Sequence, residues 1–222
     1  MAVHHRFDDI TIDDLRAQGS MKWTRMPDHL AAFVAEMDFG IAPVIAQALH
    51  QAVDTPTLGY TPPAIKDEMS AATSEFLHSR FSWSIPPERI YPTADVVSAY
   101  DFVLERFARP GTPVILPTPA YMPFFTITPM RGRDVIEVPM IHGETDRADM
   151  DLEGIARAFE QGAHVLILCN PHNPLGRVYT REELVALSEV VEAHGGMVFS
   201  DEIHAPLTFP GHTHLPYASL SE

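Results

Sequence analysis

Cysteine and long apolar runs are scarce in this sequence of 222 residues, and each scarcity excludes a class of protein. The single cysteine, Cys169, cannot form an internal disulfide, which argues for a reducing compartment and predicts a cytoplasmic protein. No apolar run approaches the roughly 20 residues that a membrane-spanning helix needs. The N-terminal segment MAVHHRFDDI lacks the apolar stretch of a secretory signal. We therefore expect no membrane partner.

Positive charge is also scarce, with 15 Lys and Arg against 30 Asp and Glu, and a formal net charge of -15. Such a charge repels polyphosphates, so a nucleic-acid partner is not expected. The chain also lacks the patterns G-x-G-x-x-G and G-x-x-x-x-G-K-[ST] of nucleotide-binding domains. What is present, 45% apolar residues among moderate charge, is typical of a globular protein with a sizeable core.

From about residue 43 onward, short apolar runs alternate with helical patterns. The runs typical of buried strands are 114–117, 135–139, 164–169 and 197–201. The spacing of apolar residues predicts helices over 43–53, 65–80, about 95–107, 151–161 and 180–194. The last of these opens on a Thr-x-x-Glu capping box at Thr180 and Glu183. This alternation predicts an α/β fold with parallel strands, whose ligands bind beyond the carboxyl ends of the strands.

Polar side chains follow three of these predicted strands. Asn173 lies in a turn shaped by two Asn-Pro pairs, where its amide could point into a crevice; an ordinary turn is the alternative. Asp201 follows a buried strand, where a carboxylate is costly unless it is solvated, paired or used; capping of the following turn is the alternative. His204 comes three residues later and could serve the same crevice or be structural. Tyr121, between two prolines, is expected at the rim; a place in the core is the alternative.

Two further features admit a functional and a structural interpretation. Backbone N–H groups at the helix start around Ala94, Asp95 and Val96 could bind a phosphate, although Asp95 is also an ordinary N-cap residue. His204, His212 and His214 have a spacing that can chelate a metal. Because no Cys or carboxylate cluster accompanies these histidines, we predict no metal site.

Taken in chain order, these segments resemble the aspartate-aminotransferase-like superfamily of pyridoxal-phosphate enzymes, fold type I. Within it they are similar to the cystathionine β-lyases, also called cysteine-S-conjugate β-lyases or carbon–sulfur lyases. The matching segments are MKW (21–23), AEMDF (35–39), GYTPP, PAYMPFF, CNPHNPLGRV and SDEIHAPL. The resemblance implies a three-layer αβα fold with a mostly parallel sheet. It assigns residues 1–42 to an N-terminal arm and part of a small domain, and residues 43–222 to the large cofactor-binding domain.

The resemblance also implies the cofactor, pyridoxal 5'-phosphate, and a role for each candidate residue. Asp201 would pair with the protonated ring nitrogen, and Asn173 would hydrogen-bond the phenolic oxygen. His204 stands where relatives with aminotransferase activity often have a tyrosine that serves this oxygen. Tyr121 would stack on the ring face.

The phosphate would be held by the amides around Ala94, Asp95 and Val96. The TAD sequence here replaces a turn that more commonly contains Gly or Ser, so the geometry of these amides is open. Tyr60, in the GYTPP loop, would reach the phosphate of a neighbouring subunit, because sites of this family form across a homodimer.

The implied reaction is an α,β-elimination from cystathionine or another cysteine S-conjugate, which yields a thiol, pyruvate and ammonia. An aminotransferase binds the same kind of substrate and removes the same Cα proton, so the residues alone leave that alternative open. The chemistry needs a lysine, but the chain has only Lys22 and Lys66, and both are expected at the surface. We therefore expect the catalytic lysine beyond Glu222, in a longer lyase of which this chain is the front part. The alternative is a catalytically inert fragment that acts as a binding protein.

Overall fold

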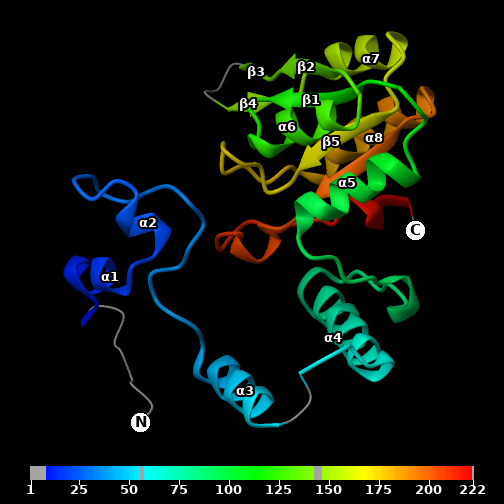
Figure 1. Cartoon of the computed structure of the whole chain (residues 1–222). Helices are drawn as coiled ribbons and strands as arrows, with labels where there is room; N and C mark the ends of the chain where they lie inside the picture. The colour runs from blue at the N-terminus through cyan, green and yellow to red at the C-terminus, as the bar shows by residue number, and fades with distance from the viewer. Residues whose placement is uncertain (1–8, 56–57, 143–146, 222) are drawn as a thin grey trace. The chain divides into compact units, whose positions relative to one another are not determined.

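A computed structural model describes residues 9–55, 58–142 and 147–221 (Figure 1). The chain divides into two compact units, Met1–Thr61 and Pro62–Glu222, which are described separately. The domain boundary expected after residue 42 stays a prediction.

The first unit contains three helices in its described part, α1 (Ile12–Gln18), α2 (Met21–Thr24) and α3 (Pro43–Asp54). Helix α1 begins at a capping box formed by Thr11 and Asp14 and ends at Gly19, whose φ of 75° is readily adopted only by glycine. Helix α3 matches the helix predicted over 43–53. Helices α1 and α2 were not predicted, because elements this short carry too few apolar positions to show a period.

Lys22 is drawn into this first unit rather than left at its surface. Its side chain is 12% exposed, and Nζ donates to Oδ2 of Asp38 at 2.7 Å. The other carboxylate oxygen of Asp38 accepts a hydrogen bond from the Trp23 indole at 2.8 Å, and the bond from Lys22 lowers the pKa of this carboxyl. The prediction of a surface Lys22 was therefore wrong, because a carboxylate distant in sequence engages the amine.

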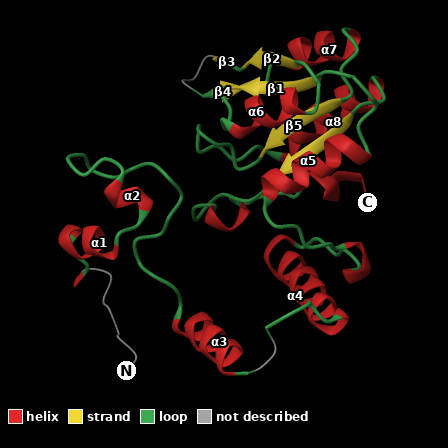
Figure 2. Ribbon diagram, viewed as in Figure 1, coloured by secondary structure: helices red, strands yellow, loops and turns green. Residues whose placement is uncertain are grey.

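The second unit is built around a parallel sheet. Its helices of two turns or more are α4 (Pro63–Phe81), α5 (Val96–Arg106), α6 (Pro123–Met130), α7 (Leu152–Glu160) and α8 (Arg181–Ala193). The sheet strands are β1 (Val114–Thr118), β2 (Val135–Pro139), β5 (Val165–Cys169) and β6 (Met197–Asp201), in the order β2-β1-β5-β6. A small antiparallel hairpin joins β3 (Ile141–His142) to β4 (Ala148–Asp149). The strands of the sheet are all parallel, so their carboxyl ends lie at one edge (Figure 2).

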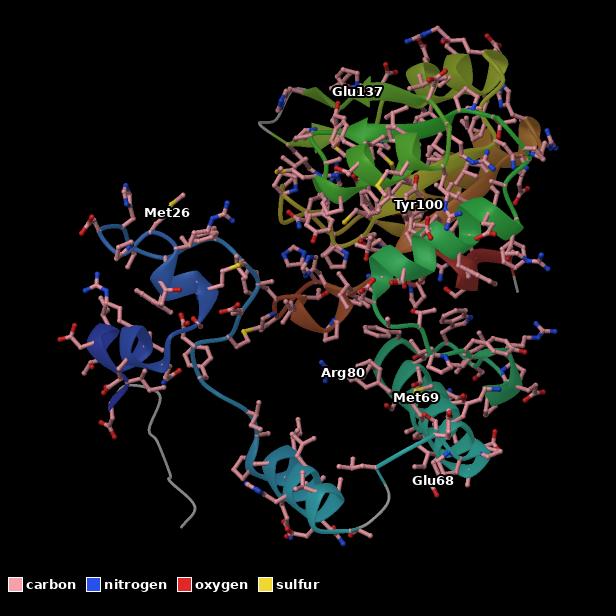
Figure 3. The ribbon with its side chains drawn as sticks, viewed as in Figure 1. Met26, Glu68, Met69, Arg80, Tyr100 and Glu137 are labelled. Carbon is pink, nitrogen blue, oxygen red and sulfur yellow. The ribbon has the colours of Figure 1, made fainter. Side chains whose placement is uncertain are left out.

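Helices cover both faces of this sheet, which confirms the three-layer αβα fold. Alternate strand residues face opposite sides, because successive side chains of a strand point in opposite directions. Ile115 and Leu166 pack with α7 and α8 in one buried cluster. Val114 and Ile167 pack in the other cluster with α5 and α6, where Tyr100 lies (Figure 3).

The elements predicted for this unit are confirmed to within about three residues at each end. The capping box of Thr180 and Glu183 is present at the start of α8. Helix α6 was not predicted, because it is short and contains Pro129 in its interior. In the described residues, no helix combines the length and the apolar character that crossing a lipid bilayer takes.

Candidate functional site

Three of the predicted site residues follow neighbouring strands of the sheet. Tyr121 follows β1, Asn173 follows β5, and Asp201 is the last residue of β6. Strand β5 lies between β1 and β6, and Cys169 at its end is opposite Asp201. The topology therefore brings these side chains to one edge of the sheet, as the sequence predicted.

The start of helix α5 lies at the same edge. At the other end of the helix, the backbone N–H of Arg109 donates to Nδ1 of His164, just before β5, at 3.1 Å. The Arg109 guanidinium donates to the carbonyl of Gly195, just before β6, at 3.3 Å. The end of α5 is thus at the amino edge of the sheet. An eleven-residue helix spans about 16 Å, close to the length of a five-residue strand, so Asp95 lies near the carboxyl edge.

The turn after β5 is held by hydrogen bonds from its own strand and from the next one. The backbone N–H of Asn170 donates to the carbonyl of Asp201 at 2.9 Å, and its side-chain oxygen accepts from the N–H of Tyr179 at 3.2 Å. The thiol of Cys169 donates to the carbonyl of Pro171 at 3.4 Å and accepts from the N–H of Asn173 at 3.3 Å. The Asn173 side chain is half-buried and has no hydrogen-bond partner among the described residues.

Asp201 is a buried acid without a cationic partner in the described part of the chain. The residue is 6% exposed, and Oδ1 accepts one hydrogen bond, from the N–H of Ile203 at 3.2 Å. Burial raises the pKa of its carboxyl above the usual value, and the Ile203 bond and nearby His204 offset only part of this rise. Such a carboxylate is poised to bind a cation or a strong hydrogen-bond donor.

Glu202, the next residue, is paired rather than available. Its carboxylate accepts from the Ser200 hydroxyl at 2.8 Å, from the N–H of Tyr217 at 2.8 Å and from Nε2 of His214 at 2.9 Å. His214 is therefore engaged away from His204 and His212. Among residues 9–55, 58–142 and 147–221, no group of three His, Cys, Asp or Glu side chains is arranged to hold a metal ion.

The remaining predicted site residues differ in their exposure and in their contacts. Tyr121 is 42% exposed and meets the Phe124 ring edge-on at 5.9 Å, which fixes it at the rim. Asp95 is the N-cap of α5, with Oδ1 accepting from the N–H of Ser98 at 2.6 Å. His204 is half-buried and precedes a short 3-10 helix. Tyr60 lies in the first unit and is fully exposed, at 103%.

Two further residues near this edge were not among the predicted site residues. Cys169 is buried, and burial raises its pKa to about 11, but its thiol also bonds the turn that carries Asn173. Arg177 is buried beneath the turn. The position of Cys169 directly before the two Asn-Pro pairs was a sequence signal that its side chain could contact this turn. A lone arginine after a glycine gives no such signal.

Comparison with known proteins agrees with this arrangement. The family model for aminotransferase class I and II matches residues 34–221. A cystathionine beta-lyase of Corynebacterium glutamicum is 36% identical over 95% of this chain and 55% of its own length. Cystathionine beta-lyase PatB of Bacillus subtilis is 35% identical over 91% of this chain and 54% of its own length. The chain thus spans about half the length of the curated relatives it matches.

A solved structure shows the same fold with a cofactor. Cystalysin from Treponema denticola, which contains a pyridoxal 5'-phosphate cofactor, superimposes with a TM-score of 0.84 at 30% sequence identity. The match covers 95% of this chain and 54% of cystalysin. The αβα layers, the strand-end residues and a family match over most of the sequence lead to one conclusion: this chain belongs to the class I and II aminotransferase family.

Proposed function

We propose that the protein containing this chain is a pyridoxal-phosphate-dependent carbon–sulfur β-lyase that acts on cystathionine or related cysteine S-conjugates. The observation that carries the proposal is Asp201, a buried carboxylate at the end of β6 that lacks a cationic partner among the described residues. The names of the two curated relatives support the lyase branch, and that of the solved structure supports the cofactor.

The residues at the carboxyl edge fit a phosphorylated hydroxypyridine. When bound, pyridoxal phosphate supplies an electron sink that stabilises negative charge at the Cα atom of an amino acid. Asp201 would hold a proton on the ring nitrogen, because a buried carboxylate gains most from a cationic neighbour. The half-buried amide of Asn173 would donate to the phenolic oxygen. His204, three residues after Asp201, is the second candidate for a contact with this oxygen. Tyr121, at the rim, would cover one face of the ring.

The start of α5 would hold the phosphate, but with a carboxylate already present. Asp95 accepts the N–H of Ser98, and this bond lowers the pKa of its carboxyl, so the group is charged at neutral pH. A phosphate dianion would therefore share the positive end of the helix with a negative side chain. The negative charge at this helix start arises because the TAD sequence replaces the commoner turn that contains Gly or Ser.

Replacing Asp95 by asparagine is expected to tighten the binding of a phosphate-bearing ligand. Asparagine also caps helices well, so the change removes the charge while the cap remains. We expect an affinity about two- to fivefold higher, the size of a charge effect at an exposed helix start. Isothermal titration calorimetry with pyridoxine 5'-phosphate measures it, and Glu88→Gln, an exposed residue upstream of α5, is the control. Unchanged or weaker binding would contradict the argument.

The two lysines of the chain are engaged elsewhere. Lys22 pairs with Asp38 in the first unit, and Nζ of Lys66 lies 4.8 Å from the centre of the Tyr91 ring. Neither follows a strand of the sheet. We therefore expect the covalent partner of the cofactor in a part of the whole protein outside this chain.

A homodimer and a cytoplasmic location belong to the same proposal. The resemblance to fold type I enzymes supports the homodimer, in which Tyr60 would reach the phosphate of the neighbouring subunit. Sedimentation equilibrium of the whole protein measures its oligomeric state.

Binding and activity test the proposal separately. Pyridoxine 5'-phosphate lacks the aldehyde, so it cannot react with Lys22 or Lys66, and we expect one molecule to bind per chain. For the whole protein, L-cystathionine should give thiol, pyruvate and ammonia without an added oxo acid. A requirement for an oxo acid, with formation of a new amino acid, would instead identify an aminotransferase. Absence of binding would leave the inert-fragment alternative.

A further inference from the structure

Beneath the turn that follows β5 lies a charged group that is almost fully buried, the guanidinium of Arg177. Its side chain is 8% exposed and pairs with Asp149 at 2.9 Å and with Glu183. It also donates to the carbonyl of Ala148, and its Cζ lies 4.6 Å from the centre of the Tyr179 ring. Burying a charge costs free energy even when the charge is paired. The segments that the guanidinium connects therefore indicate what this arginine does.

Arg177 joins three segments that are separate in the sequence. Its side chain contacts the end of the β3–β4 hairpin through Ala148 and Asp149, and the start of α8 through Glu183. Its backbone closes the turn, because its carbonyl accepts from the N–H of His172 at 2.7 Å. The turn therefore cannot shift as a unit without breaking contacts to a hairpin or to a capped helix.

Asn173 lies inside the loop that Arg177 closes. On one side, the N–H of Asn173 is held by the Cys169 thiol at 3.3 Å. On the other, the N–H of Gly176 donates to the carbonyl of His172 at 2.7 Å, within the pair that Arg177 completes. The position of the Asn173 amide thus depends on β5 at one end and on Arg177 at the other.

We infer that Arg177 is a positioning residue, whose buried guanidinium ties this turn to the β3–β4 hairpin and to α8 and thereby sets where the Asn173 amide meets a bound ligand. The inference rests on the proposed function, in which that amide donates to a phenolic oxygen. Lysine cannot replace arginine here, because a planar fork is needed to reach two carboxylates and a carbonyl while stacking on Tyr179.

The test compares Arg177→Lys and Arg177→Met with the same changes at Arg181, an exposed arginine at the start of α8. The probe is pyridoxine 5'-phosphate, and calorimetry gives its affinity. Near-ultraviolet absorbance over a pH series gives the pH at which the bound phenolic group ionises. Both Arg177 variants should bind about tenfold more weakly, the loss of roughly one hydrogen bond to a charged oxygen. The ionisation pH should rise, because the donor that favours the phenolate is displaced.

A double variant separates positioning from general loosening of the chain. Asn173→Ala alone should reproduce both effects, and adding Asn173→Ala to Arg177→Lys should change little further, since the two residues act through one contact. Additive losses would overturn the inference. So would Arg177 variants that bind and titrate like the Arg181 variants.

Three other outcomes each decide a different point. If the wild-type chain does not bind the probe, the proposed function fails and the inference fails with it. If the wild type binds and only the role of Arg177 is absent, the proposed function stands alone. If Arg177→Met loses the far-ultraviolet circular dichroism of the folded chain, the comparison of Arg177→Lys with Arg181→Lys decides whether Arg177 is a positioning residue.

Discussion

Replacement of Asp201 by asparagine is expected to weaken the binding of pyridoxine 5'-phosphate by about 10- to 100-fold, since a buried charge-assisted hydrogen bond to the ring nitrogen is lost. The bound ring should also lose the absorbance of its protonated form, because no carboxylate remains to hold the proton. Calorimetry and near-ultraviolet absorbance measure the two effects. Glu137→Gln removes an exposed carboxylate from β2 of the same sheet (Figure 3) and should change neither.

The same replacement is expected to stabilise the chain without ligand. Burial raises the pKa of Asp201 in the folded state above its usual value of 3.8, so the folded chain holds this proton more tightly than the unfolded chain. The stability that this group contributes is therefore full below pH 3.8 and is lost as pH rises through the raised pKa. Asparagine has no such loss.

A pH series of urea unfolding checks this sign. The free energy of unfolding of Asp201→Asn, relative to wild type, should increase from acid toward neutral pH and then level off. A difference that stays constant with pH, or that decreases, would show that the buried carboxylate is compensated in the folded chain. Opposite effects on stability and on binding would mark Asp201 as a residue kept for its ligand.

Glu202→Ala is expected to cost about 2–4 kcal/mol of unfolding free energy, because one carboxylate serves three donors and one of them belongs to a buried histidine. The His214 ring, which meets the Phe81 ring of α4 edge-on at 5.1 Å, would lose its carboxylate partner. The change would thus loosen the C-terminal segment from β6 and from α4.

Urea or thermal unfolding measures the loss. Glu202→Gln should lose less, because its side-chain oxygen still accepts hydrogen bonds. Glu189→Ala, on the exposed surface of α8, is the matched control and should lie within about 0.5 kcal/mol of wild type. A Glu202→Ala chain as stable as this control would refute the proposed anchoring role.

The fold could be predicted from the sequence because its signals are local. The buried strand 165–169 is an uninterrupted apolar run, and α8 is announced by the capping box of Thr180 and Glu183. Alternation of such segments then allows few arrangements other than a parallel sheet covered on both faces. Helix α6 escaped prediction because Pro129 lies within it, where proline opposes the usual helical signal.

The candidate site was predicted in part. The location of Asn173 and Asp201 at the carboxyl edge of the sheet could be predicted, because polar residues at the ends of apolar strands stand out and parallel strands bring their carboxyl ends together. The local partners of Asp95 and, outside the site, of Lys22 could not be predicted. Whether Asp95 caps the helix or leaves its amides free, and whether Lys22 is solvated or paired with Asp38, depends on side-chain geometry rather than on spacing.

The sequence by itself determined the layered fold, the edge of the sheet at which the polar residues gather, and the family to which they are similar. These follow from periodicity and from motifs, which need only neighbouring residues. The tertiary structure alone decided that Glu202 is an anchor while Asp201 lacks a cationic partner among the described residues, and that Arg177 lies beneath the turn of Asn173. Those outcomes depend on partners such as His214, 12 residues from Glu202, and Ala148, 29 residues from Arg177, whose approach no local pattern encodes.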